Sequence, residues 1–490
     1  MEGPSDFCKP EDFEYFLQQR HLLTQNAVDG ILLRAKPAET TVGLINHGST
    51  CYLNSIIQCL VQNASFLKAV FTTNDANDNP IVKELKKLVT FLVHSIRNAV
   101  GTKDLLSSFG WNQSQIHDQH DAQEFYSILL DALSQASPLL EGKLHETFRG
   151  SDADVIQCTE CQYEKTTDSF YQHLSVEVPD HLEGKPSSDN ITRALGSLLA
   201  DSLKAEVLDE NNKWECSSCN RKVCANRLHQ YKSLPETVTI QLKRFRFDPT
   251  SKKRRKLNTA IEFQEQYNFN ELLQPSSPSL DDNGGLYQLT GIICHLGTAM
   301  GGHYKSYVRS VKDMSTWWEC NDENIHKCTE EEIQTLFLSS GNPDQPQQQQ
   351  STIMENAYVL FYTRLPSMQN ASSEYASFIS NLIPSTKEIE DDNESYRTLM
   401  RLSAIQRSIS HMDISIYRVN EITPLANTTL IPFDFPKQTT VQAATQQIYS
   451  HLTEKGIITE NEYPLTNVRI RKFSNTRNSK GETFDSREQS

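Results

Sequence analysis

The fold is decided by the stretch Gly43-Leu-Ile-Asn-His-Gly-Ser-Thr-Cys-Tyr-Leu-Asn-Ser-Ile-Ile-Gln58, where a polar loop leads into an apolar helix. Asn46 to Thr50 predicts a loop, because glycine, asparagine and small hydroxyl residues are poor in helix interiors. From Cys51 onward apolar residues recur at helical spacing, with Ser49 or Thr50 as the candidate N-cap. The positive end of the helix dipole stabilises a thiolate, so Cys51 is a candidate nucleophile. The alternative is a small apolar cysteine that only fills core space.

Length, charge and cysteine content narrow the class of protein. The chain has 490 residues, enough for about three domains. It has 62 acidic against 47 basic residues, which disfavours a general nucleic-acid binder and suits a partner with a basic surface. We expect no secretory signal and no membrane span, because no run reaches the roughly 20 apolar residues needed. Eleven cysteines then indicate metal ligands and reduced thiols in the cytoplasm and/or nucleus.

Two helices are predicted after the first. Residues 81–100 carry apolar side chains on one face, as an amphipathic helix does. The other helix begins within Asp118-Gln-His-Asp-Ala-Gln-Glu-Phe125, where Asp121 as N-cap and Glu124 three residues later match a capping box. Capping alone explains both carboxylates. A cleft that binds arginine is the alternative, because carboxylates accept paired hydrogen bonds from a guanidinium group.

Four cysteines have the spacing of a metal site. Cys158-Thr-Glu-Cys161 and Cys216-Ser-Ser-Cys219 are two knuckles, each able to present two thiolates to one tetrahedral ion. We expect one structural Zn²⁺ with no open coordination position, and no catalytic cofactor. Cys224 is a spare thiol that could serve as an alternative ligand. Four thiols without a metal are the other interpretation.

Further along, strands alternate with polar turns. Val238–Phe247 predicts a strand, and a basic run, Lys252-Lys-Arg-Arg-Lys256, follows it. That run reads as a solvated loop, with nuclear import or contact with an anion as the alternative. Two more strands flank the glycine turn 297–302, and His303 opens the second of them. Taken alone, His303 could be an ordinary half-buried strand residue.

Together these segments resemble the ubiquitin-specific proteases. The family's cysteine box, Gly-Leu-x-Asn-x-Gly-x-Thr-Cys-Tyr-x-Asn-Ser, is matched at every position from Gly43 to Ser55. The other family motifs follow in order, at Gln119–Phe125, Leu242–Phe245, Gly301–Val308, Trp317–Asp322 and Ala357–Tyr362. The resemblance covers about two-thirds of the chain and implies an α+β, papain-like fold of thumb, palm and zinc-ribbon fingers.

The resemblance also assigns catalytic roles. It implies that Cys51 is the nucleophile, His303 the general base and Asn46 a donor to the oxyanion. Asn321 would orient His303, at a position where many relatives have aspartate and others asparagine. The next residue, Asp322, could hold a water or partner the histidine instead. If both lay on successive strand positions they would face opposite sides, so we expect Asn321→Ala to impair activity more than Asp322→Ala.

Substrate recognition is implied in the same way. Residues matching Asp121, Gln123, Glu124 and Phe245 lie in the family where the arginine-containing tail of ubiquitin is held. The expected partners are ubiquitin and ubiquitinated proteins, with no nucleic acid and no membrane, and the chain is expected to be monomeric. Two other functions stay open: a catalytically silent ubiquitin-binding scaffold, and a zinc-ribbon nucleic-acid module around Lys252–Lys256, which the net charge of −15 disfavours.

We predict four regions along the chain. They are an N-terminal extension (1–41), the catalytic domain (42–364, with fingers at about 150–260), a linker with a short helix at 396–409 (365–411), and an atypical or incomplete ubiquitin-like β-grasp domain with a polar tail (412–490). The last region is predicted from two strands, 412–417 and 429–435, a helix begun by Thr439 or Thr440 and ended by Gly456, and a strand at 466–473. A chain that ends near Arg364 is therefore expected to fold and keep its catalytic residues.

Overall fold

The computed structural model describes most of the chain between residues 41 and 456. The described residues are 41–111, 120–179, 194–210, 212–248, 252–273, 285–337, 355–365, 385–414, 431–436 and 439–456, with isolated residues at 15–22 and 379–383. They belong to two compact units, Ala35–Asn393 and Met1–Arg34 with Glu394–Ser490. The last predicted strand, 466–473, lies outside the described residues.

A helical lobe surrounds the helix that Cys51 begins. All eleven residues of α3 (Cys51–Val61) are buried, including the polar Asn54, Ser55 and Gln58. The other helices of this lobe are α4 (Ala64–Thr72), α5 (Pro80–His94), α6 (Lys103–Ser108), α8 (Ala122–Ala136) and α9 (Pro138–Phe148). The predicted helix 81–100 ends earlier, at His94, and residues Ala99–Val100 instead form a short strand, β2. This strand pairs with β1 (Gly43–Leu44), which precedes the loop that leads to Cys51.

The helical lobe packs on a large, mainly antiparallel sheet. In order across the sheet, its strands are β17 (Asn324–Lys327), β16 (Trp317–Asn321), β15 (Gly301–Arg309), β14 (Leu286–Thr298), β18 (Glu355–Arg364), β10 (Thr237–Lys243) and β5 (Leu174–Glu177). A further strand, β13 (Gln266–Asn268), pairs with β14. Helix α3 lies against β15, so the strand that carries His303 and the helix that begins at Cys51 share one core. A second core on the other side of the sheet is covered in part by α10 (Leu195–Ser202) and α11 (Glu330–Phe337).

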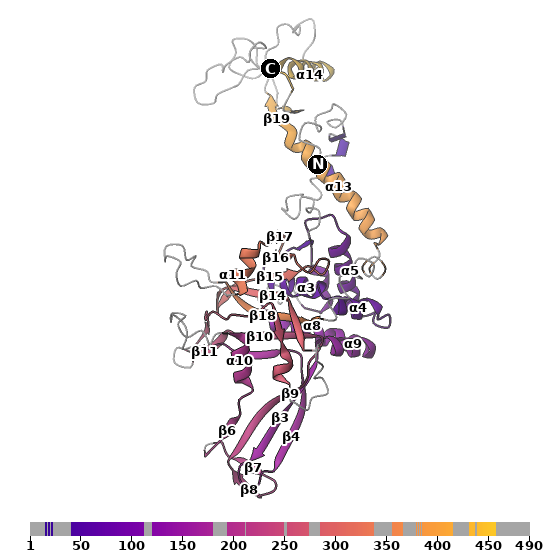
Figure 1. Cartoon of the computed structure of the whole chain (residues 1–490). Helices are drawn as coiled ribbons and strands as arrows, with labels where there is room; N and C mark the ends of the chain where they lie inside the picture. The colour runs from indigo at the N-terminus through magenta and orange to yellow at the C-terminus, as the bar shows by residue number, and fades with distance from the viewer. Residues whose placement is uncertain are drawn as a thin grey trace, which may run out of the picture. The chain divides into compact units, whose positions relative to one another are not determined.

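A smaller sheet extends away from this large sheet (Figure 1). Its order is β4-β3-β9-β6 (Glu164–Tyr171, Gly150–Cys158, Ala225–Ser233 and Glu206–Leu208). The hairpin of β7 (Trp214–Cys216) and β8 (Arg221–Val223) lies at its far end, where Cys158 also ends β3. A separate hairpin pairs β11 (Phe245–Asp248) with β12 (Lys253–Lys256). The mixture of helices and sheets agrees with the predicted α+β class.

The C-terminal unit contains part of the predicted ubiquitin-like pattern. Strands β19 (Ile409–Ile414) and β20 (Ile431–Pro436) pair in antiparallel fashion, and helix α14 (Val441–Glu454) follows. Thr440 is the N-cap, since its hydroxyl accepts a hydrogen bond from the Ala443 amide at 3.2 Å. Gly456 follows the helix with a φ of +67°, a left-handed conformation that glycine adopts readily. Among the described residues no helix is long and apolar enough to cross a membrane.

The predicted boundary at Arg364 differs from the compact unit in the structure. That unit continues to Asn393, beyond the predicted end of the catalytic domain. Ile383 is fully buried in the core of the helical lobe. The helix predicted at 396–409 is longer, because α13 runs from Lys387 to Ser408. Residues 365–411 are therefore not simply a linker, because part of this segment packs on the helical lobe.

Ending the chain at Arg364 is consequently expected to destabilise the protein, contrary to the expectation from sequence. Losing the buried Ile383 side chain alone should cost about 2–5 kcal/mol of unfolding free energy. Urea unfolding of chains that end at Arg364 and at Ser408 measures the difference. The longer chain should unfold at clearly higher urea, and equal midpoints would show that residues 365–408 contribute no stability.

Candidate active site

The loop before Cys51 is shaped by the side chain of Asn46. Its Oδ1 accepts hydrogen bonds from the backbone amides of Gly48 at 3.0 Å and Thr50 at 3.2 Å. Gly48 has a φ of +111°, which a residue with a Cβ rarely adopts. Thr50 is at the N-cap position, but its hydroxyl does not cap the helix and instead accepts a hydrogen bond from the backbone amide of His47. Cys51 thus begins α3, where unpaired amides favour a thiolate.

His303 faces both Cys51 and Asn321. Its Nε2 lies 2.7 Å from Oδ1 of Asn321, at the end of β16. A hydrogen bond with Cys51 is the largest cause that raises the pKa of His303 to about 9. Burial opposes this shift, and the bond with Asn321 adds to it. The imidazolium form is therefore favoured beside the sulfur, as a thiolate nucleophile requires.

Asp322 is the centre of a buried amide network. It lies one residue beyond β16 with a φ of +52°, so strand alternation does not apply and its side chain reaches the same site as that of Asn321. Asp322 Oδ1 accepts a hydrogen bond from the side-chain Nδ2 of Asn54 at 2.7 Å, and Oδ2 accepts one from the side-chain Nδ2 of Asn46 at 2.8 Å. The distance from Oδ2 to His303 Nε2 is 3.9 Å. Burial raises the pKa of Asp322, while bonds from Asn54 and Asn46 lower it.

Asn54 is a site residue that sequence reasoning missed. It is buried one helical turn after Cys51, so both side chains lie on the same side of α3. A polar amide at that position in a mostly apolar helix was the available signal. Its partner, Asp322, is 268 residues away in the chain, and no local pattern could have identified it.

The predicted ubiquitin-tail residues line one groove of about 650 Å³. Asp121, Gln123, Glu124 and Phe245 all border it, and the exposed Arg246, Phe247 and Arg254 lie on the β11–β12 hairpin. The ring of Phe245 packs edge-on against His295 and Tyr358, with centroids 5.1 and 5.4 Å apart. The groove therefore has acidic groups at α8 and basic groups at the hairpin.

The two carboxylates of this groove differ in their contacts. Asp121 Oδ1 accepts the amides of Gln123 and Glu124 and so caps α8. Its Oδ2 accepts the hydroxyls of Tyr358 at 2.6 Å and Tyr304 at 3.5 Å. Glu124 is exposed on the first turn of α8. Asp121 is thus occupied by the fold, and Glu124 is the better placed of the two for an arginine.

Neutralising these carboxylates singly should separate their roles. Glu124→Gln is expected to raise KM about tenfold with little change in kcat, because a charge-assisted hydrogen bond is lost in both ground and transition states. Asp121→Asn keeps one capping oxygen but loses the acceptor of the Tyr358 and Tyr304 hydroxyls, so it should instead lower the unfolding free energy by about 1 kcal/mol. Steady-state kinetics and urea unfolding measure the two effects. A Glu124→Gln variant with the KM of wild type would leave only the capping role.

The basic run also divides into two parts. Residues 252–255 are exposed, but Lys256 is buried beneath the turn that precedes His303. Its Nζ donates hydrogen bonds to the carbonyl of His295 at 2.8 Å and that of Gly297 at 3.3 Å. Burial, followed by repulsion from Arg244, lowers the pKa of Lys256 to about 8. Lys256 therefore belongs to the scaffold of the histidine turn rather than to a solvated loop.

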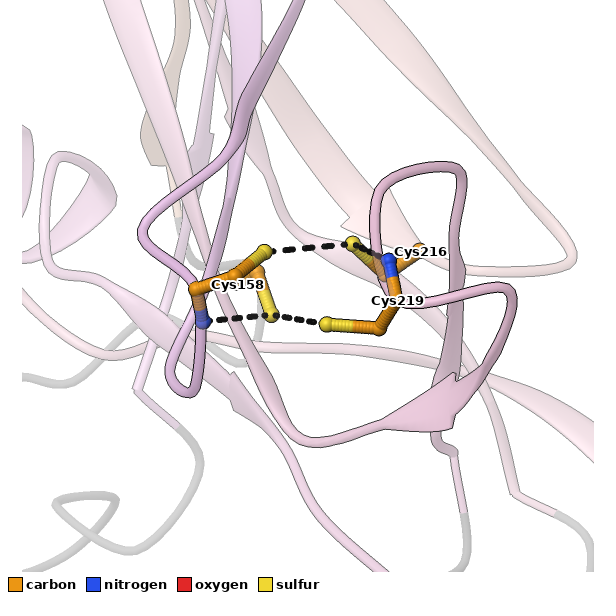
Figure 2. A group of neighbouring side chains, drawn as sticks. Cys158, Cys216 and Cys219 are labelled. Atoms are coloured by element: carbon orange, nitrogen blue, oxygen red, sulfur yellow. Dashed lines mark hydrogen bonds between the residues drawn. The ribbon is translucent and has the colours of Figure 1, made fainter.

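The four predicted cysteines form one cluster at the far end of the β4-β3-β9-β6 sheet (Figure 1). Their sulfur atoms all lie within 4.8 Å of one another. Cys158 and Cys219 sulfurs are 3.9 Å apart, and those of Cys161 and Cys216 are 3.6 Å apart. Zinc–sulfur bonds of about 2.3 Å in a tetrahedron place sulfurs roughly 3.8 Å apart, so the donor set fits zinc. Figure 2 shows side chains from the two knuckles pointing toward one another.

Removing one cysteine of this cluster should destabilise the fingers. Cys158→Ser is expected to lose the bound zinc and to unfold this region locally, because metal binding there is coupled to folding. Metal analysis by mass spectrometry and hydrogen exchange of β3 and β9 measure both effects. Cys224→Ser is the matched control, since Thr159 contacts only the Cys224 backbone carbonyl. Wild-type protein that contains no zinc when prepared without chelator would refute the site.

Comparisons with known proteins agree with this site. The family model "Ubiquitin carboxyl-terminal hydrolase" matches residues 42–362. The mouse protein "Ubiquitin carboxyl-terminal hydrolase 47" is 26% identical over 423 residues, covering 74% of this chain and 30% of the mouse protein. Its Drosophila melanogaster namesake is 28% identical over 457 residues, covering 76% and 28%. "Ubiquitin carboxyl-terminal hydrolase 48" of Danio rerio is 31% identical over 312 residues, covering 60% and 28%.

These matches span less than a third of each relative's own length. Within this chain, however, the family model covers every motif from the cysteine box to the closing strand. The resemblance stated from sequence is thereby confirmed, together with the papain-like cysteine protease fold that it implies. The chain belongs to the ubiquitin carboxyl-terminal hydrolase family, as one of its ubiquitin-specific proteases.

Proposed function

We propose that this chain is a thiol-dependent deubiquitinase that hydrolyses the bond after the C-terminal glycine of ubiquitin. Two observations carry the proposal: the hydrogen bond of His303 with Asn321, and the raised pKa of His303, whose largest cause is Cys51 at the start of α3. A thiolate beside an imidazolium, with the ring held by an amide oxygen, is the arrangement needed for acyl transfer. The acidic and exposed Glu124 in the adjoining groove supports recognition of an arginine-containing tail.

The reaction proceeds in two halves. The Cys51 thiolate attacks the glycine carbonyl carbon, and the oxyanion that forms accepts hydrogen bonds from Asn46 and from amides near Cys51. Asn46 has two amide hydrogens, of which one is donated to Asp322. When the tetrahedral species collapses, the carbon–nitrogen bond breaks and His303 donates its proton to the leaving amine. Water then attacks the thioester, gives a proton to His303, and releases ubiquitin and the thiolate.

The other parts of the chain have supporting roles in this proposal. One Zn²⁺ bound by Cys158, Cys161, Cys216 and Cys219 would hold the end of a zinc-ribbon finger and take no part in chemistry. The paired strands and helix at 409–454 support a ubiquitin-like domain. None of the ten cysteines among the described residues forms a disulfide, which supports a reducing compartment, the cytoplasm and/or nucleus. We propose ubiquitin and ubiquitinated proteins as partners of a monomer that binds neither nucleic acid nor membrane.

Mixing the purified full chain with a ubiquitin C-terminal fluorogenic amide tests the proposal. Release of the fluorophore at a rate proportional to protein concentration is the expected result. Binding of ubiquitin without release would favour the catalytically silent scaffold instead. Absence of both binding and release would refute the function altogether.

A further inference from the structure

A segment that follows every protease motif packs on the helical lobe. Ile383 is fully buried in that core, and Ile379 packs against it. His94 Nε2, at the end of α5, lies 2.5 Å from the carbonyl oxygen of Ile383 and donates to it. These contacts attach Ile379 and Ile383 to the corner of the helical lobe where α5 ends.

The first turns of α13 contact the same corner through polar groups. Arg97 donates two hydrogen bonds to Asp392, from Nε at 2.8 Å and from a terminal nitrogen at 2.7 Å. Asn393 Oδ1 accepts the Ile96 amide at 3.0 Å, and its Nδ2 donates to the His94 carbonyl at 3.1 Å. Asn393 thus satisfies backbone groups where α5 ends, groups that a helix terminus leaves without partners.

The corner bound by Asp392 and Asn393 leads directly to the catalytic loop. Asn98 Nδ2 donates to the Glu323 carbonyl at 2.9 Å, and the Asn98 carbonyl accepts the Gly43 amide at 2.8 Å. Gly43 lies so close to Glu323 that a Cβ there would be 2.6 Å from its carbonyl oxygen. The Val100 carbonyl accepts the Ile45 amide at 2.9 Å.

Residues 322 and 323 complete this connection. The Leu44 amide donates to the Asp322 carbonyl at 2.9 Å. The backbone amide of Asn46 donates a hydrogen bond to Glu323 Oε1 at 2.9 Å, and the side-chain Nδ2 of Asn46 donates one to Asp322 Oδ2. Segment 96–100 therefore contacts both the loop that carries Asn46 and the turn that carries Asp322.

We propose that Ile379, Ile383 and the start of α13 up to Asn393 form a clamp that positions the Asn46–Asp322 network for catalysis, with the Arg97–Asp392 pair among its polar contacts. The proposal rests on the proposed deubiquitinase function, and Arg97 is a positioning residue within it. The tail groove is built from α8 and β11 and is not part of the connection. Loosening the clamp should therefore lower kcat and leave KM nearly unchanged.

The test compares full-length Arg97→Met and Asp392→Asn with Lys87→Met. Lys87 pairs with Glu388 near the start of α13 at 3.0 Å, but both side chains are exposed, so this ion pair should hold α13 only weakly and Lys87→Met controls for the loss of a surface charge. Arg97→Met and Asp392→Asn are each expected to lower kcat about threefold to tenfold per active site titrated with a ubiquitin electrophile, with KM within about twofold. The kcat of the double variant should be no lower than that of the more impaired single variant, because both substitutions remove the same contact.

Hydrogen exchange separates failure of the clamp from failure of the enzyme. Amides of Leu44, Ile45 and Asn46 should exchange faster in Arg97→Met than in wild type or Lys87→Met, whether or not the protein turns over substrate. Unchanged exchange with unchanged kcat would overturn the clamp. So would a lower kcat explained wholly by fewer titratable sites, or an equal loss in Lys87→Met. A wild-type chain without activity but with the expected exchange would refute only the proposed function.

Discussion

Replacing Cys51 with alanine is expected to abolish hydrolysis of ubiquitin amides and leave ubiquitin affinity within about twofold of wild type. The sulfur forms and breaks the covalent bond, and no neighbouring group can replace it. The substitution removes little volume from a residue that is 3% exposed, so the fold and the tail groove should persist. Fluorogenic turnover and ubiquitin binding by calorimetry measure the two properties.

Cys59→Ala is the matched control for this variant. Cys59 lies on the same helix, and burial raises the pKa of its thiol, which keeps the sulfur protonated and unreactive. Its loss should lower the unfolding free energy by about 1 kcal/mol and spare turnover. Residual turnover by Cys51→Ala above the background of the assay would contradict the nucleophile assignment.

Alanine at Asp322 is expected to lower kcat/KM at least as much as alanine at Asn321, which reverses the order expected from sequence. Asn321→Ala should cost about tenfold to a hundredfold, roughly 1.4 to 2.8 kcal/mol, by freeing the ring of His303. Asp322→Ala removes the acceptor of the Asn46 side-chain amide and the nearest of the three acceptors of the Asn54 side-chain amide. Each unpaired buried group costs about 1–3 kcal/mol, and Asn46 would lose its orientation toward the oxyanion.

The pH dependence of the two variants should differ. The pKa of His303 is raised to about 9 from 6.5, so its contribution to stability is complete below about 6.5 and is lost as pH rises through about 9. Activity of wild type should fall over the same alkaline range, as the imidazolium loses its proton. Asn321→Ala should move that decline to lower pH. Asp322 raises the pKa of His303 less than Asn321 does, so Asp322→Ala should shift the decline less and mainly lower kcat at every pH.

Profiles of kcat/KM against pH for both variants, with ubiquitin binding as the control, measure these effects. An Asp322→Ala variant with nearly wild-type kcat/KM would show that the amide network does not support catalysis. An Asn321→Ala variant with an unshifted alkaline decline would remove Asn321 as the partner of His303. In that case the third catalytic role would pass to Asp322.

The sequence predicted the residues that have a local pattern. Cys51 is a candidate from the loop-to-helix change, His303 is assigned only by the resemblance of Gly301–Val308 to a family motif, and the four cysteines are identified from their spacing. The N-cap positions Asp121 and Thr440 were predicted because the pattern for a cap spans only three or four residues. The helix at 81–100 was extended too far, because its end at His94 depends on Asn393, a residue 299 positions away.

Contacts between distant segments account for what the sequence did not reveal. Asn54, Lys256 and Asp392 each act through a partner that is near in space only after folding. The side chain of Asp322 was expected to alternate with that of Asn321, and its left-handed φ cancels that rule. Asp121 shows a further limit, because a capping pattern does not reveal that Tyr358 takes its second oxygen.

Reaction of the full chain with a ubiquitin C-terminal electrophile tests the central claim most directly. Mass spectrometry of the intact product and of its peptides identifies which thiol has reacted. One ubiquitin per chain, attached at Cys51, is the predicted result, and Cys51→Ala should remain unlabelled. Labelling at Cys59 or Cys320, both buried thiols of the same core, would contradict the assignment of Cys51 as the nucleophile.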